Sequence, residues 1–227
     1  MIVISIRLTR LQCAKTLFHY LRLLLDQGSV DEIHIIDKLV HPDDMKWLRR
    51  NVIADKRIRI YEKGEPTYSP DDTIVHCVDT IVFIDVRRFD QFVKKGRAAA
   101  HVINGDAVCA QHQRLYGFLS SDLFTPETCE QLYQNASAAT EMHNMFLDNF
   151  EEYLGTAQKA TDAKTDSSNS PFWVEGSGEP SLDMSMVVAN LFTVQQIGDG
   201  FDDQKFATRY TMLKDRYAKL ISNGGAL

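Results

Sequence analysis

Residues 71–90 read Asp-Asp-Thr-Ile-Val-His-Cys-Val-Asp-Thr-Ile-Val-Phe-Ile-Asp-Val-Arg-Arg-Phe-Asp, and the fold is organised around this stretch. It contains two apolar, β-branched runs, Thr73–Val78 and Ile81–Ile84, separated by Asp79. Strands this apolar are typical of parallel sheets covered by helices on both faces. A carboxylate at the end of such a strand lies where open α/β sheets bind ligands, but Asp is also a common turn residue. Position alone leaves both roles open for Asp79.

The first eighty residues alternate between strand and helix patterns. Apolar runs of strand character occupy 2–6, 33–36, 57–61 and 73–78, helical spacing of apolar residues occupies 11–27 and 41–52, and a loop spans 64–70. This alternation favours a parallel sheet with right-handed crossovers, and hence a Rossmann-like half. We expect the ends of the first three strands, near Ser5 and Arg7, Asp37, and Arg57, to converge on one edge of the sheet.

The second half carries further elements. We expect a short helix at 87–96, a buried strand at 98–104, a long helix at 126–154, a last strand at 185–193 and a final helix at 204–221. Residues 155–171 are rich in small and polar residues that cannot bury apolar surface, so we interpret this segment as a mobile loop. Trp173, close behind it, either anchors the loop or packs against a sugar, and anchoring is the favoured interpretation.

Composition excludes several classes of protein. The 227 residues carry a formal net charge of −6 without a block of Lys and Arg, which disfavours binding along nucleic acid. No apolar run is long enough to span a membrane, and residues 1–6 indicate a strand rather than a signal peptide. The four cysteines are widely spaced and lack the paired spacing of a zinc site. We therefore expect a single cytoplasmic domain with buried free thiols.

A family resemblance is carried by residues 76–84, His-Cys-Val-Asp-Thr-Ile-Val-Phe-Ile, by Phe89 and by the run 102–104, Val-Ile-Asn. They resemble the signature of a group of GT-A-type, nucleotide-sugar-dependent glycosyltransferases found among others in chloroviruses and fungi. That signature reads Lys-Ile-Asp-Asp-Asp-Ile-Val-Phe-Ile, then a Phe, then a Val-Asn or Ile-Asn strand. Where the family has three acids, this chain retains only the middle one, Asp79.

The resemblance implies an α/β, GT-A (Rossmann-like) fold with a mostly parallel sheet flanked by helices. It divides the single domain, 1–227, into a nucleotide-binding half at 1–104 and an acceptor and catalytic half at 105–227. If the protein is viral, the expected location is the cytoplasm of the host cell.

The nucleotide site follows from the same resemblance. In the family, a residue after the first strand and an acid after the second lie near the base and the ribose, which points to Ser5 or Arg7 and to Asp37. The carboxylate of Asp37 suits a ribose diol, and its alternative role is to form a turn before Lys38. Arg57 either neutralises phosphate or is a charge at the edge of a strand.

A divalent ion is the expected cofactor, because Mn²⁺ or Mg²⁺ stabilises a leaving diphosphate by bridging its oxygens. Asp79 is the candidate metal ligand, and the hydroxyl of Thr80 is a weak second one. Alternatively, Arg7, Arg57 and backbone amides offset the diphosphate charge without a metal.

The resemblance also points to residues for the acceptor and the chemistry. His143, within Glu-Met-His-Asn-Met-Phe-Leu, resembles a His-x-x-Phe-Leu element of the family and gains an acceptor or metal-adjacent role, whereas without the resemblance it is a half-buried histidine. Asp203 is the first choice for the carboxylate that deprotonates the acceptor hydroxyl, followed by Asp202 and Asp199. Their alternative role is to begin the final helix.

We therefore expect an inverting glycosyltransferase that moves a sugar from a nucleoside diphosphate, with UDP the expected carrier, to a hydroxyl of a glycan or glycoprotein. The alternative is a degenerate, non-catalytic GT-A domain that binds a nucleotide, a glycan or a partner protein. A nucleotidyltransferase or a dinucleotide oxidoreductase is disfavoured because no glycine-rich phosphate loop follows the first strand.

Overall fold

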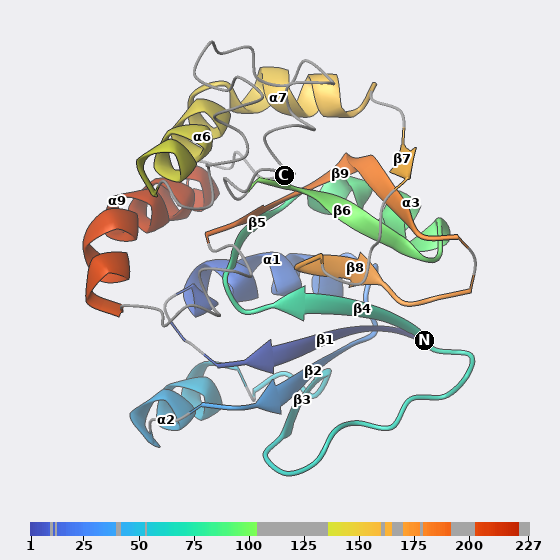
Figure 1. Cartoon of the computed structure of the whole chain (residues 1–227). Coiled ribbons are helices and arrows are strands. Elements are labelled where there is room, and N and C mark those ends of the chain that lie inside the picture. The colour runs from blue at the N-terminus through green and yellow to red at the C-terminus, as the bar shows by residue number, and fades with distance from the viewer. Residues whose placement is uncertain are drawn as a thin grey trace.

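The computed structural model describes residues 1–9, 11, 13–39, 42–52, 54–103, 136–159, 162–164, 170–177, 179–191 and 203–222. Within these ranges the protein is an α/β structure built on one mixed sheet (Figure 1). The strands are β1 (Ile2–Leu8), β2 (Glu32–Asp37), β3 (Ile58–Tyr61), β4 (Thr73–Val78), β5 (Ile81–Ile84), β6 (Ala98–Ile103), β7 (Ala163–Lys164), β8 (Phe172–Val174) and β9 (Ser181–Asn190).

The sheet has the strand order β3-β2-β1-β4-β8-β6-β9-β5, and β7 pairs with β9. The first four of these strands are parallel to one another, as the alternation of strands and helices predicts. The remainder is mixed: β8 is antiparallel to both β4 and β6, β6 and β9 are parallel, and β5 and β7 run antiparallel to β9. The expectation of a mostly parallel sheet therefore holds only for the first half of the chain.

Six α-helices are described, together with a short 3-10 helix, η1 (Val86–Arg88). They are α1 (Ala14–Asp26), α2 (Pro42–Asn51), α3 (Phe89–Lys94), α6 (Ala136–Asp148), α7 (Phe150–Ala157) and α9 (Asp203–Ser222). The apolar stripe of α1, which includes Leu17 and Leu21, belongs to the same buried cluster as Ile4 and Ile6 of β1. Gly28 ends α1 with φ at 76°, a left-handed conformation that glycine adopts without strain.

The second half differs from the expected elements in two places. The long helix expected at 126–154 is divided, because α6 ends at Asp148 and α7 begins at Phe150, and residues 126–135 lie outside the described part of the chain. The segment 155–171, expected to be a mobile loop, includes the last turn of α7 and strand β7. Phe150, Tyr153 and Leu154 are buried and hold α7 against the sheet, and β7 is held by its pairing with β9.

Among the described residues no helix is long and apolar enough to cross a membrane.

Candidate functional site

The candidate site lies at the carboxyl ends of β1 and β4. The chain passes from β1 outward to β2 and β3, then returns to pair β4 with the opposite side of β1. Such a reversal of strand order is a topological switch point, and ligands of open α/β sheets bind in the crevice outside the carboxyl ends of the strands there. Thr9 directly follows β1 and Asp79 directly follows β4, so both residues lie at this crevice.

Asp79 is tied to the end of β1. Its carboxylate oxygen Oδ2 accepts hydrogen bonds from the backbone N–H of Thr9 at 2.6 Å and from the Thr9 hydroxyl at 2.7 Å. The side chain is almost fully buried, with 4% of Asp79 exposed. The placement of Asp79 at the carboxyl edge is thus confirmed, and one of its oxygens helps to hold the ends of β1 and β4 together.

Thr80 belongs to a buried polar network that reaches the second half of the chain. Its hydroxyl donates to Oδ1 of Asn190 at 2.6 Å, and its carbonyl accepts from the backbone N–H of Leu191 at 3.2 Å. Because Thr80 is 1% exposed and Asn190 is 2% exposed, this contact is shielded from solvent. Thr80 therefore connects the β4–β5 turn to the end of β9.

His143 extends the same network between two helices. Its Nδ1 lies 2.8 Å from the hydroxyl of Tyr217, so α6 and α9 are joined by a buried hydrogen bond. Burial lowers the pKa of His143 to about 4, and the backbone carbonyl of Asn190 partly opposes this shift.

The acceptor role expected for His143 does not suit this location. Its side chain is 0% exposed and lies between α6 and α9, where it packs edge-on against the ring of Tyr217. A group that contacts an acceptor glycan needs an open surface. We infer instead that His143 positions the end of β9, and through it Thr80.

Ser5 and Arg7 lie inside β1 rather than after it, because the strand continues to Leu8. Their side chains share one face of the sheet by the alternation of a strand. Ser5 is 6% exposed at the centre of the parallel strands, whereas the side chain of Arg7 is 67% exposed and its guanidinium binds Glu65 at 2.6 Å. Of the two, only Arg7 presents a charge to solvent near the candidate crevice.

Asp37 is the last residue of β2 and pairs in register with Leu8, so it lies at the same carboxyl edge as Thr9. Its Oδ1 accepts a hydrogen bond from the backbone N–H of Leu39 at 2.8 Å. The turn role that the sequence suggests for Asp37 is therefore confirmed, and the ribose role stays a prediction.

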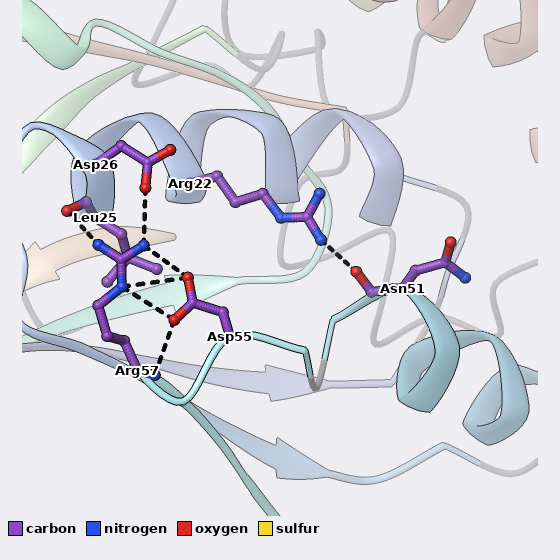
Figure 2. A network of polar contacts seen from close by, with 6 residues as sticks. All are labelled: Arg22, Leu25, Asp26, Asn51, Asp55 and Arg57. Atoms are coloured by element: carbon purple, nitrogen blue, oxygen red, sulfur yellow. Dashed lines mark hydrogen bonds and ion pairs between the residues drawn. The ribbon is translucent and has the colours of Figure 1, made fainter.

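Arg57 contradicts the expectation that it joins this edge. It precedes β3 and thus lies at the opposite, amino edge of the parallel strands. Figure 2 shows its guanidinium bound to Asp55 at 2.7 Å, to Asp26 at 2.8 Å and to the carbonyl of Leu25 at 2.8 Å. The hydrogen bonds to Asp55 and Asp26 raise the pKa of Arg57, and its bond to Leu25 adds a side-chain donor to a carbonyl in the last turn of α1 that also accepts from the backbone N–H of Gly28. Arg57 is therefore a helix-capping residue rather than a phosphate ligand.

The same network includes a second arginine. Arg22 of α1 donates to the carbonyl of Asn51 at the end of α2 (Figure 2). The two arginines therefore connect α1 with α2 and with the start of β3.

The described residues do not by themselves fit a divalent cation. No three His, Cys, Asp or Glu side chains gather there to hold a metal. Asp79 uses Oδ2 for Thr9, and the Thr80 hydroxyl donates its proton to Asn190. We therefore derive no step through a metal ion.

The expected catalytic acids are only partly described. The backbone of Asp203 begins α9, which agrees with the helix-start role suggested for it, but its side chain lies outside the described part of the protein. Asp202 and Asp199 also lie outside the described residues.

Comparisons with known proteins add no information on this site. No protein-family model matches the chain, and searches of curated proteins and of solved structures found no significant match.

Three residues of the site were missed by the sequence analysis: Thr9, Asn190 and Tyr217. A partial signal exists for Asn190, because it is a polar residue directly after the apolar run 186–189. Thr9 and Tyr217 carry no local signal, since their roles depend on partners 70 and 74 residues away.

Proposed function

We propose that the protein binds a nucleoside diphosphate sugar at the carboxyl ends of β1 and β4 and transfers its sugar to a hydroxyl of a glycan. The observation that carries this proposal is the switch point between β1 and β4, with Thr9 and Asp79 beside it. The signature-like run 76–84 ends β4, forms the turn with Asp79 and continues into β5, so the one acid that the run shares with the GT-A signature lies at this crevice.

Binding at this crevice requires groups that offset the charge of a diphosphate. Arg7 is the exposed cation on β1 nearest the edge, and its ion pair with Glu65 on the surface contributes little stability, so a phosphate competes for it readily. Backbone N–H groups after β1 are natural additional donors. A divalent ion remains an option only if residues outside the described part supply further oxygen ligands.

Transfer with inversion requires a carboxylate that removes the proton of the acceptor hydroxyl as this oxygen attacks the anomeric carbon. We assign this role to Asp203, with Asp202 as the alternative, because of the family resemblance. In this proposal the Thr80–Asn190–His143 network holds the β4–β5 turn and the end of β9 in fixed positions at the site.

A second candidate function is nucleotide or glycan binding without transfer. Its support is the contact between Asp79 and Thr9, which engages the carboxylate that the family resemblance assigns to the metal. The two functions differ in turnover alone and not in the position of the site.

Thermal unfolding with UDP, GDP, CDP and ADP, each with and without Mn²⁺, tests the binding step. A ligand at 100 times its dissociation constant adds about 2.7 kcal/mol to the free energy of unfolding. We expect one diphosphate, UDP in the first place, to raise the midpoint, and Arg7→Gln to reduce this shift. No shift with any diphosphate would overturn the proposal.

Release of the diphosphate from the matching nucleotide sugar, measured with and without a glycan acceptor, tests the transfer step. Asp203→Ala is expected to retain nucleotide binding and to lose turnover. If the wild-type protein binds the nucleotide sugar but does not cleave the bond between its sugar and its diphosphate, the non-catalytic alternative is correct.

A further inference from the structure

Strand β8 presents two aromatic side chains to opposite faces of the sheet. Phe172 is fully buried, and its ring packs against those of Phe89 and Phe92 at centroid distances of 6.4 and 5.8 Å. Phe172 therefore anchors this segment in the core, the role that the sequence suggested for Trp173. Trp173 lies on the other face and remains partly exposed.

Trp173 is held rigidly by its neighbours. It pairs in register with His76 of β4, and the two rings are stacked with centroids 4.1 Å apart and planes inclined by 17°. Nε2 of His76 lies 3.0 Å from the carboxylate of Glu175. β8 is also paired with β6 through Ala99, so the indole is supported from both sides of the strand. We call Trp173, His76 and Glu175 the Trp173 platform.

The platform combines an apolar ring with polar groups that solvent can reach. The side chain of His76 is 33% exposed and that of Glu175 is 60% exposed. Further along the same register lie Ser5 and His34, which are buried, and the ring of Tyr68 stacks on that of His34 with a centroid distance of 5.5 Å. The loop that carries Tyr68 therefore covers this face at His34, whereas His76 and Glu175 beside Trp173 remain in reach of solvent.

We propose that the Trp173 platform binds a sugar ring of the glycan acceptor. A pyranose has an apolar face of C–H groups, which an indole can contact, and a rim of hydroxyls, which a carboxylate and an imidazole can hydrogen-bond. An aromatic side chain with a few fixed polar groups is the usual composition of a small-ligand site. Because His76 and Trp173 are already stacked, little side-chain entropy is lost on binding.

This inference rests on the proposed function and defines its acceptor side. His76 lies three residues before Asp79 on β4, which corresponds to roughly 10 Å along a strand. The platform therefore holds a sugar unit at some distance from the reacting hydroxyl, and the predicted substrate is an oligosaccharide chain rather than a monosaccharide.

Fluorescence of a Trp47→Phe variant tests the platform. The sequence has two tryptophans, so Trp173 is the only one left in this variant. The probes are maltotriose, cellotriose, laminaritriose, xylotriose and chitotriose, titrated up to tens of millimolar. We expect at least one of them to cause a saturable change. In calorimetry on the parent protein, Trp173→Ala and Glu175→Gln should each weaken the same sugar, Trp173→Ala by about tenfold. Glu179→Gln, an exposed acid in the same segment, should bind it unchanged.

The proposal is overturned if none of the five sugars gives a saturable change, or if folded Glu175→Gln and Trp173→Ala bind as tightly as the parent protein. Circular dichroism establishes whether each variant is folded, and Glu175→Gln leaves the core contacts of Phe172 in place. Nucleotide binding is scored separately by thermal unfolding. A protein that binds UDP but no sugar at Trp173 retains the proposed function without the platform, and the reverse result leaves a glycan-binding platform without the transferase.

Discussion

The buried imidazole of His143 makes the stability of this protein depend on pH. Burial lowers its pKa from 6.5 to about 4 in the folded state, whereas the unfolded chain exposes it to water. Between these two values the unfolded state binds more protons than the folded state, so the free energy of unfolding decreases as the pH falls. The contribution is complete above pH 6.5 and is lost as the pH decreases toward 4.

The size of the effect follows from the two pKa values. The difference between 6.5 and about 4 corresponds to about 3 kcal/mol when the loss is complete, at 1.36 kcal/mol per pKa unit. At pH 5 the same pKa values give a loss of about 2 kcal/mol, which is a large part of the stability of an ordinary domain.

The assay is urea unfolding of wild type and His143→Gln at pH 7 and pH 5. His143→Gln removes the titrating group, so the wild type should lose about 2 kcal/mol more than the variant over this range. Tyr217→Phe is the matched control: it removes the hydroxyl that bonds Nδ1 but keeps the imidazole, and so should keep the dependence on pH. Equal losses in wild type and His143→Gln would refute the burial of a neutral His143.

Three further predictions concern the fold. Phe172→Ala should lower the free energy of unfolding by about 3–5 kcal/mol, because the ring is fully buried, and a loss below 1 kcal/mol in urea unfolding would contradict its anchoring role. No atom lies within 4 Å of a Cβ added at Gly28 or Gly155, so the backbone decides the effect of each substitution. Gly28→Ala should cost about 1–2 kcal/mol of backbone strain at φ 76°, whereas Gly155→Ala inside α7 should stabilise the protein by about 0.5–1 kcal/mol. Equal midpoints of thermal unfolding for the two variants would contradict this prediction. Arg57→Gln should lower the midpoint of thermal unfolding but leave the stabilisation by UDP unchanged, and a loss of that stabilisation would restore Arg57 to the nucleotide site.

Much of the first half of the fold is predictable from local sequence. The apolar runs, the helical spacing in α1 and the Gly28 stop predict the elements of the parallel strands within a few residues. The position of Asp79 is predictable for the same reason, because a polar residue between two buried strands must lie at an edge of the sheet. The turn role of Asp37 is equally local, since its partner is two residues away.

The edge of the sheet at which a residue lies, and whether another element covers it, are less predictable. Arg57 was placed at the carboxyl edge with Asp37, but it precedes β3 and caps α1 at the amino edge. The strand expected at 57–61 agrees with β3 to within one residue, but Arg57 is at its amino start, and the carboxyl end of that strand is near Tyr61. His143 was expected to face an acceptor. The helical spacing of apolar residues around it predicts an apolar stripe on α6, but it does not predict that α9 covers this stripe.

The sequence by itself determined which segments form strands and helices in the parallel half, and that an acid follows the fourth strand, because these features depend on neighbours along the chain. Only the tertiary structure decided that the three residues of β8 lie between β4 and β6, that Asp79 binds Thr9, that Thr80 binds Asn190, and that His143 binds Tyr217. The physical reason is that strand order and buried hydrogen bonds are set by contacts between distant segments, for which a short strand or a single polar residue carries no periodic signal.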